Sequence, residues 1–180
     1  GRSSGRRASS MPDHVVEAAA IAKGMASAGK LDIPVKLVWT REDDMTGGYY
    51  RPAYLHTMSA SLDAAGNAAG WQHRIVGQSI TEGTPIAAMT IKNGIDSTSV
   101  EGAANLPYAI PNLAVDLHTP SIAVPVLWWR SVGSTHTAYA TEVLIDELAI
   151  AAGKDPVAFR SALLASKPRP RSEERRGGKE

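Results

Sequence analysis

The sequence of 180 residues contains no cysteine and only one phenylalanine. Without cysteine the chain cannot form disulfide bonds, thiolate zinc sites or cysteine-ligated iron–sulfur clusters of its own. No apolar run approaches the roughly 20 residues that a membrane-spanning helix requires. No basic segment followed by an apolar one is visible as an export signal. Any redox centre must therefore be bound through other groups or be carried by a partner.

A strong charge of either sign is also missing. Lysine and arginine number 19 against 18 acidic residues, which gives a net charge of +1, and 43% of the residues are hydrophobic. This balance is typical of a globular protein with one or two cores. The body of the chain lacks a stripe of alternating basic and aromatic residues, so we do not expect nucleic-acid binding.

The two ends differ in composition from the middle. Residues 1–10 are predicted to form a basic loop of glycine, serine and arginine before the first helix. Residues 167–180 contain no apolar side chain to offset the entropy of ordering, so we expect a disordered tail. The final string, RSEERRGGKE, resembles the in-frame translation of a sequencing adapter, and we expect it to be a scar. Residues 11–166 are then the folded region, as a fragment of a larger protein.

Apolar spacing in this region predicts helices and strands without regular alternation, which indicates an α+β fold of mixed strands with packed helices. The expected helices begin at Asp13, cover 137–152 with Ala140, Leu144, Leu148 and Ala152 inward, and follow Asp155 with Val157, Phe159, Leu163 and Leu164 inward. The expected strands are 33–40, 54–62, 68–80 and 113–118, the second and third joined by a hairpin turn at 63–67. Residues 41–52 are predicted as a loop or short helical turn, and residues 80–94 as a loop with one weak helix.

The stretch LWWRSVGSTHTAYATE, residues 127–142, places two tryptophans and an arginine before a Ser/Gly/Thr loop that leads into a helix. Such a loop presents backbone N–H groups at the positive end of the helix dipole, where an oxyanion can bind. Arg130 adds a fork-shaped cation, and Trp128 and Trp129 are either flat walls for a planar ring or core residues. The alternative is a core tryptophan pair beside an ordinary helix. Residues 1–10 form a second basic loop of the same kind, which favours an anionic ligand between the two loops.

Four segments carry a resemblance to a known family. They read, in order, GRRASS, VKLVWTREDDMTGGYYRPAYLHTMSASLDAAGNAAGWQHRIVGQSI, NLPYAIPN and WWRSVGSTHTAYATEVLIDELAIAAGKDPVAFR. Together they resemble the molybdenum-cofactor-binding large subunit of the xanthine dehydrogenase and aldehyde oxidase superfamily. The branch that contains the isoquinoline 1-oxidoreductase beta subunit and bacterial aldehyde dehydrogenases is the most similar.

The resemblance implies a set of molybdopterin-binding residues on two loops. The first is a glycine-rich GGGFG-type loop whose last glycine matches Gly5, although Ser4 stands where the family has phenylalanine. The second is an aromatic-Arg-Gly/Ser motif followed by a backbone-approach glycine and a polar residue near the pterin. The implied cofactor-binding residues are therefore Gly5, Trp129, Arg130, Ser131, Gly133 and His136.

The resemblance also implies a function, the hydroxylation of an aldehyde or N-heterocycle with oxygen from water. The catalytic glutamate belongs to a segment beyond this chain, so we assign no catalytic residue here. The iron–sulfur clusters are expected on a small partner subunit, and the compartment is the bacterial cytoplasm or periplasm. Purine-oxidising relatives carry a substrate arginine where this chain reads DSTSVEG, so a purine is not the expected substrate. The alternative is a non-catalytic α+β interaction module with a subunit interface from Thr137 onward.

The remaining polar candidates have simpler interpretations. Glu42, Asp43 and Asp44 are predicted to be a solvated turn or a first helical turn instead of a metal site. The tyrosine pair at 49–50 is expected to pack in the core or at an interface. Four histidines without metal-ligand spacing are predicted to be surface or strand residues, namely His14, His56, His73 and His118.

Overall fold

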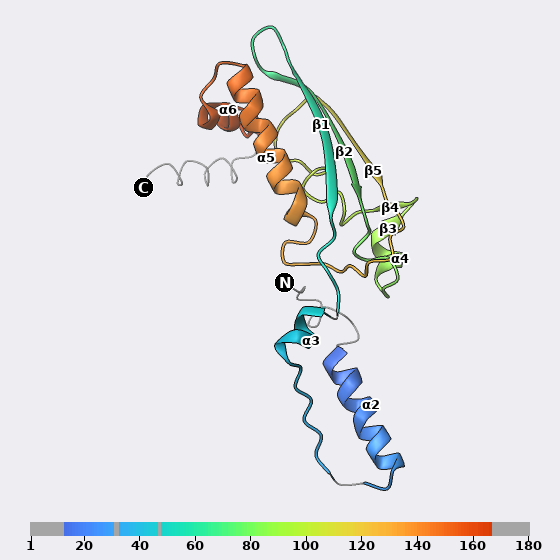
Figure 1. Ribbon diagram of the computed structural model, residues 1–180. Coiled ribbons are helices and arrows are strands. Elements are labelled where there is room, and N and C mark those ends of the chain that lie inside the picture. The colour runs from blue at the N-terminus through green and yellow to red at the C-terminus, as the bar shows by residue number, and fades with distance from the viewer. Residues whose placement is uncertain (1–12, 31–32, 47, 167–180) are drawn as a thin grey trace.

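The computed structural model describes residues 13–30, 33–46 and 48–166 (Figure 1). The helices are α2 (Asp13–Ser27), α3 (Arg41–Thr46), α4 (Ala87–Thr90), α5 (Ser134–Ala151) and α6 (Pro156–Leu163). The strands are β1 (Tyr54–Leu62), β2 (Ala68–Gly77), β3 (Ile91–Lys92), β4 (Ile95–Asp96) and β5 (Asn112–His118). The expected α+β class is confirmed. The expectations for residues 1–10, Gly5 included, and for the tail at 167–180 lie outside the described residues.

A three-stranded sheet in the order β1-β2-β5 organises the body of the protein. β1 and β2 form the expected antiparallel hairpin, from the pair Tyr54 and Gly77 to the pair Leu62 and Ala68. The turn is held by the Asp63 carboxylate, which accepts hydrogen bonds from the backbone N–H groups of residues 65 and 67. β5 joins β2 in parallel, with Trp71 beside Leu113. A sheet of this kind must pack one face against another layer, such as a helix, to bury its apolar side chains.

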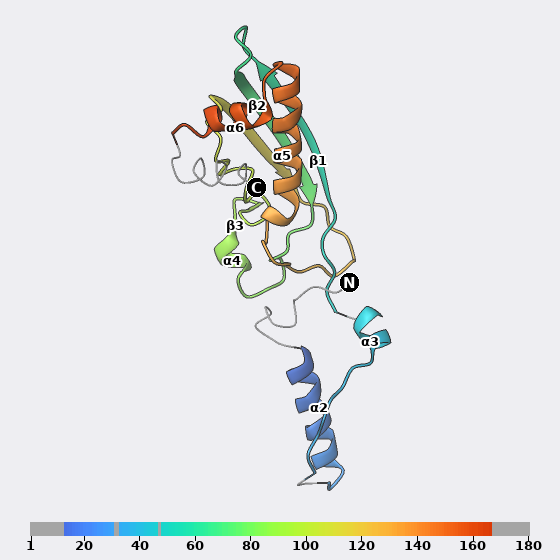
Figure 2. The ribbon, with the colours of Figure 1, turned by 90° about the vertical axis from the view of Figure 1, so that its left-hand side faces the viewer.

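Helix α5 covers that face, and both views show it lying along the sheet with α6 folded back beside it (Figures 1 and 2). The core between the two layers is one cluster of buried side chains: Ala68, Trp71, Tyr108, Ile145, Leu148, Ala149, Phe159, Leu163 and Leu164. The predicted apolar stripe of α5 is confirmed in part, since Leu148 is buried and Leu144 and Ala152 pack against the core cluster. The buried residues are Thr137, Thr141, Ile145, Leu148 and Ala149, whereas Ala140, Leu144 and Ala152 lie at the edge.

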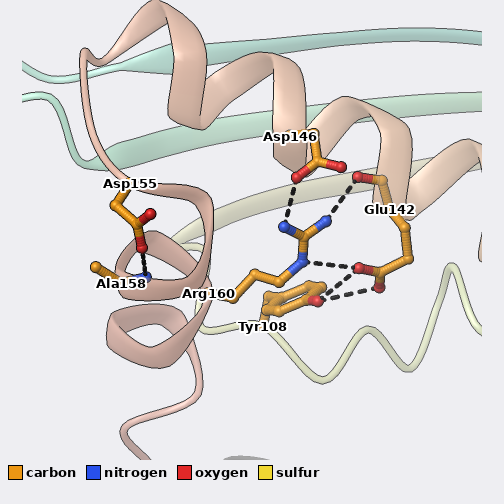
Figure 3. Close-up of polar contacts among 6 residues, drawn as sticks. All are labelled: Tyr108, Glu142, Asp146, Asp155, Ala158 and Arg160. Atoms are coloured by element: carbon orange, nitrogen blue, oxygen red, sulfur yellow. Dashed lines mark hydrogen bonds and ion pairs between the residues drawn. The ribbon is translucent and has the colours of Figure 1, made fainter. Parts of the chain in front are cut away.

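Two sets of polar contacts, one within α6 and one between α6 and α5, stabilise this part of the fold (Figure 3). Asp155 caps α6 as predicted, since its carboxylate accepts from the Ala158 N–H at 2.8 Å and Pro156 starts the helix. Arg160 bridges to α5 through Glu142 at 3.1 Å and Asp146 at 2.5 Å, and these bonds raise the pKa of Arg160. The expected inward position of Val157 is wrong, because its side chain is 54% exposed.

The predicted strand over residues 33–40 is wrong. This segment is extended, and Val35, Leu37 and Trp39 are less exposed than the residues between them, as the alternation required. Within the described part of the chain, however, it pairs with no strand. A strand needs a neighbour for its backbone N–H and C=O groups, and side-chain alternation does not supply one. The Trp39 indole N–H connects this segment to α2 by donating a hydrogen bond of 2.6 Å to the Glu17 carboxylate.

The short elements follow the sequence more closely. Residues 41–46 form helix α3, as expected for the acidic turn, and Thr40 and Asp43 make reciprocal capping bonds there. The loop at 80–94 contains the expected weak helix, α4, and also β3, which pairs with β4 in a hairpin that periodicity did not predict. None of the helices in the described part is long and apolar enough to cross a membrane.

Candidate functional site

The tryptophan-arginine segment forms a tight turn directly before α5. Ser131 and Val132 have φ angles of +69° and +44°, in the left-handed region. Internal hydrogen bonds hold the turn, from the Val132 N–H to the Trp129 carbonyl at 3.0 Å and from the Thr135 hydroxyl to the Arg130 carbonyl at 2.7 Å. Two successive left-handed residues other than glycine are costly, so the surrounding contacts must stabilise this geometry.

Gly133 is the point at which this turn touches the rest of the protein. A Cβ at Gly133 would overlap the Thr98 carbonyl and the Glu101 side chain, so only glycine fits. Its N–H donates to the Glu101 carboxylate at 2.8 Å. The structure therefore differs from the expectation of free amides here, because the positive end of α5 is already matched by a carboxylate of the protein itself.

Beside the turn lies a pocket of about 250 Å³, including its open mouth. Its lining comes from the approach to β1, the end of β2 and the start of α5: Arg51, Pro52, Tyr54, Ile80, Trp128, Trp129, Val132, Thr135 and His136. The space inside it that a water-sized group can enter is about 10 Å³, room for about one water molecule, whereas ligand pockets usually enclose about 300–1,000 Å³. In this form it can meet at most one edge of a ligand.

Tyr54 and His136 form the floor of this region as a stacked pair. Their ring centroids are 3.6 Å apart and their planes differ by 10°. The Tyr54 hydroxyl donates to the Gln78 carbonyl at 2.8 Å, and burial raises its pKa. Gly77 lies opposite Tyr54 on β2, and a Cβ there would overlap the tyrosine ring. Glycine at the end of β2 is therefore what lets the aromatic pair form.

Behind His136, three imidazoles form a chain across α5 and the sheet. His136 Nδ1 lies 3.2 Å from His56 Nε2, and His56 Nδ1 lies 2.7 Å from His73 Nε2. His56 and His73 are diagonal neighbours on β1 and β2, because His56 pairs with Ile75 and Met58 pairs with His73. The prediction of surface or strand positions holds for both, because His56 lies on β1 and His73 on β2; His73 is fully buried and His56 is half-buried.

Burial keeps these imidazoles neutral at pH 7. Desolvation lowers the pKa of His73 and of His136 to about 4 and also lowers the pKa of His56. Neighbouring imidazoles add to this effect, because a charge on one disfavours a charge on the next. A neutral imidazole carries one N–H donor and one acceptor nitrogen, so the chain behaves as a set of directional hydrogen bonds and not as a cationic patch.

Three ring nitrogens in this region are buried and have no hydrogen-bond partner among the described residues: Trp129 Nε1, His136 Nε2 and His73 Nδ1. Buried polar atoms are nearly always paired, because an unpaired one costs about 1–3 kcal/mol. Two of the three belong to side chains that line the pocket, Trp129 and His136. These two nitrogens are themselves closed off from the surface, so a bound group could pair with them only if the pocket wall shifts to uncover them.

The structure thus brings together two of the six residues that the sequence pointed to, Trp129 and His136. Arg130 and Ser131 are exposed on the adjacent turn, outside the pocket lining, and Gly5 is not among the described residues. Sequence reasoning missed Tyr54, His56 and His73. The two-residue alternation of Tyr54, His56 and Met58 on a predicted strand was the signal that places their side chains on one face.

A second hollow, of about 520 Å³ with its open mouth, lies between α6 and the hairpin turn. Its polar groups already have partners: Lys154 donates to the Gly66 carbonyl at 2.6 Å, and Asp155 caps α6. The first pocket is therefore the stronger candidate site. Among the described residues, no three histidine, aspartate or glutamate side chains are arranged to hold a metal ion.

Comparison with known sequences gives the family context of this pocket. The sequence model of the molybdopterin cofactor-binding domain matches residues 13–164, which includes every described residue of the pocket and of the imidazole chain. The match covers most of the chain, so it does not depend on the tryptophan-arginine motif alone.

Three curated relatives are similar over most of the chain. The beta subunit of the isoquinoline 1-oxidoreductase of Brevundimonas diminuta is 28% identical over 88% of this chain and 20% of its own length. A membrane-bound aldehyde dehydrogenase of Gluconacetobacter polyoxogenes, named for pyrroloquinoline quinone, is 30% identical over 87% of the chain and 20% of its own length. A nicotinate dehydrogenase subunit of Pseudomonas putida is 30% identical over 71% and 11%. The chain thus spans about a fifth or less of the relatives' lengths.

Proposed function

The chain belongs to the molybdopterin cofactor-binding domain family, and from that premise we propose that it forms one wall of a molybdopterin site in a longer molybdenum-dependent oxidoreductase. The observation that carries the proposal is the pocket whose lining holds two buried ring nitrogens without partners, Trp129 Nε1 and His136 Nε2. The family match alone does not indicate where on this chain the cofactor would bind.

The residue types around the pocket suit one edge of such a cofactor. Molybdopterin is an anionic, acceptor-rich ring system, and the lining includes Trp128 and Trp129, with buried ring nitrogens that lack partners in Trp129 and His136. Arg51 adds a cation to the lining; its guanidinium donates to the Thr135 carbonyl at 2.9 Å and keeps further N–H groups.

We assign the six expected residues to different tasks in this site. Trp129 and His136 contact the cofactor from the pocket, and Arg130 and Ser131 reach it from the exposed turn. Gly133 acts through the backbone, by letting the turn lie against Glu101. Gly5 lies outside the described residues, and its contact with the cofactor rests on the resemblance alone.

When bound, the molybdenum centre supplies the two-electron oxidation of a substrate carbon, with an aldehyde or an N-heterocycle as the substrate class and oxygen taken from water. The described side chains bind and orient the cofactor, and the tryptophans exclude water from its ring. None of them is assigned as the catalytic base. We propose, from the resemblance to this family, that iron–sulfur clusters on a small partner subunit would accept the electrons.

The second candidate function is a non-catalytic α+β interaction module. The internal bond between Gly133 and Glu101 favours it, because this bond gives the turn a purely structural role. It leaves the unpaired nitrogens of Trp129 and His136 unexplained. The name of the Gluconacetobacter relative raises a separate question, because pyrroloquinoline quinone is also a planar, anionic ring system.

The test is the cofactor content of the full-length protein, purified with its small subunit, in wild type and in Arg130→Ala. We expect about one molybdenum and one pterin per subunit in wild type and at least a tenfold loss in the variant, because the turn would lose its cation. Lys92→Ala is the matched control, since Lys92 is an exposed cation on β3 outside the pocket lining. A folded wild type without molybdenum, or with the quinone in its place, would overturn the proposal.

A further inference from the structure

The hydrogen bonds of the imidazole chain determine whether His136 Nε2 carries a proton or a lone pair. Both nitrogens of His56 are used, Nε2 toward His136 and Nδ1 toward His73. A neutral His56 has a single proton, so it donates at one nitrogen and must accept at the other. The two hydrogen bonds therefore run in the same direction, and the tautomers of all three histidines are fixed together.

The two ends of the chain decide which direction is the more stable. If the bonds run toward His73, its Nδ1 carries an N–H inside a side chain that is 0% exposed, with no acceptor among the described residues. If they run toward His136, His73 Nδ1 holds only a lone pair, and the N–H lies on a residue that lines the pocket. In proteins a buried N–H without a partner is rarer than a buried lone pair without one. Of the two end nitrogens, only His136 Nε2 belongs to a residue that lines the pocket, so only it could be paired by a ligand.

We propose that His73 and His56 act as positioning residues that fix His136 as a neutral donor, so that the pocket selects an acceptor atom on the edge of its ligand. In this arrangement His73 Nε2–H donates to His56, His56 Nε2–H donates to His136, and His136 Nε2–H is the donor that a shift of the pocket wall would present to the ligand. The indole N–H of Trp129 can only donate. The pocket then offers two neutral donors from different elements, which suits carbonyl or phosphate oxygens or a ring nitrogen, and disfavours an amino edge.

The charged groups near the chain do not reverse this direction. Arg51 lies near His136, where its positive charge disfavours a second proton on the ring. Asp116 is the acidic group recorded near His73, and it is bound by Arg74 at 2.7 Å. Tyr54 stacks on His136 and uses its hydroxyl toward Gln78, so it does not compete for the ring nitrogens.

The proposal rests on the proposed function for the identity of the ligand, whereas the direction of the chain can be observed directly. We would determine a neutron structure of the deuterium-exchanged holoenzyme. The expected result is deuterium on Nε2 of all three histidines and none on their Nδ1 atoms. Deuterium on His73 Nδ1, or on both nitrogens of any of the three rings, would overturn the proposal.

A pair of variants tests the consequence for binding. His73→Glu places an acceptor at the end of the chain, which turns His56 and His136 around and presents a lone pair to the ligand. His73→Gln can still donate to His56 and is the matched control. We expect cofactor retention after dialysis to fall at least tenfold in His73→Glu and to stay within twofold of wild type in His73→Gln.

The outcomes separate the two proposals. Equal cofactor retention in two folded variants would overturn the role of His73, while molybdenum in the wild type would still support the proposed function. A wild type without molybdenum would overturn the proposed function, and the deuterium positions would still decide the direction of the chain. If His73→Glu does not fold, the neutron structure alone decides.

Discussion

The region from residue 13 to 46 and the body from residue 48 to 166 use similar apolar patterns with opposite results. Both contain a helix with inward-type spacing, α2 in the first and α5 in the second. In the body, Ile145 on α5 is fully buried, whereas no residue of 13–46 whose exposure is described is buried. Figures 1 and 2 show why, since α5 lies on the sheet and α2 extends away from it.

Apolar spacing therefore predicts where a helix forms, but it does not predict whether that helix is buried. Val15, Val16 and Ile21 of α2 stay exposed because no described layer lies opposite them. A helix contributes to stability mainly through the apolar face that it packs against another layer. The stability of this chain should therefore be concentrated in the body, and three measurements can test that expectation.

The largest expected effect comes from removing a core side chain of the body. Ile145→Ala should lower the free energy of unfolding by about 3 kcal/mol, through lost burial and the cavity left behind. Ile21→Ala, on α2 at 42% exposure, is the matched control and should change it by less than about 0.5 kcal/mol. Urea denaturation followed by circular dichroism measures both variants. Equal losses would mean that α2 packs against another layer as closely as α5 does.

The second effect is a loss of stability at acidic pH that arises in the body. The folded pKa of about 4 for His73 and His136 lies below the ordinary value of 6.5, so the unfolded chain binds more protons between these limits. These two histidines contribute fully to the free energy of unfolding above about pH 7. That free energy should fall by about 2 kcal/mol as the pH drops from 6.5 toward 4, after a discount for solvent screening.

Thermal unfolding between pH 7 and pH 4.5 would measure this loss. His73→Gln should make the fall shallower, because it removes one of the groups that protonate on unfolding. His14→Gln, which changes an exposed histidine on α2, should leave the fall unchanged. A smaller loss of stability at acidic pH in His14→Gln, with no change in His73→Gln, would contradict the prediction. It would place the pH response in the N-terminal region and not in the body.

The smallest effect compares two hydrogen bonds to carboxylates, one from each region. Tyr108 donates to Glu142 at 2.9 Å within the core cluster, so Tyr108→Phe should cost about 1 kcal/mol in the free energy of unfolding. Trp39 donates to Glu17 at 2.6 Å in the N-terminal region, yet Glu17→Ala should cost almost nothing, because local opening there leaves the core intact. A cost for Glu17→Ala as large as that for Tyr108→Phe would show that the two regions unfold together.

The elements that the sequence predicted well are those with strong local signals. The hairpin at 54–77, the acidic turn at 41–46 and the Asp155 cap each depend on residues close together in the chain. The errors arose where a distant partner decides the outcome. The segment 33–40 alternates like a strand but has no neighbouring strand among the described residues, and the buried row of α5 is set by how the helix sits on β1.

The sequence predicted only part of the candidate site. The motif around Trp129 and His136 identified the correct segment, because aromatic residues, glycine and a helix start occur together there. His56 and His73 gave no usable spacing, since 17 and 80 positions separate the bonded pairs. The partner of the Gly133 amide, Glu101, is likewise 32 positions away.

By itself the sequence determined the α+β class, the hairpin, the capped helices and the likeness to molybdopterin-binding subunits, since these follow from short-range spacing and recognisable motifs. The tertiary structure decided what the side chains do. It stacked Tyr54 on His136, joined three histidines in one chain and turned the Gly133 amide to Glu101. Packing of β1, β2 and α5 sets these distances, and spacing along a chain does not determine how separate elements pack.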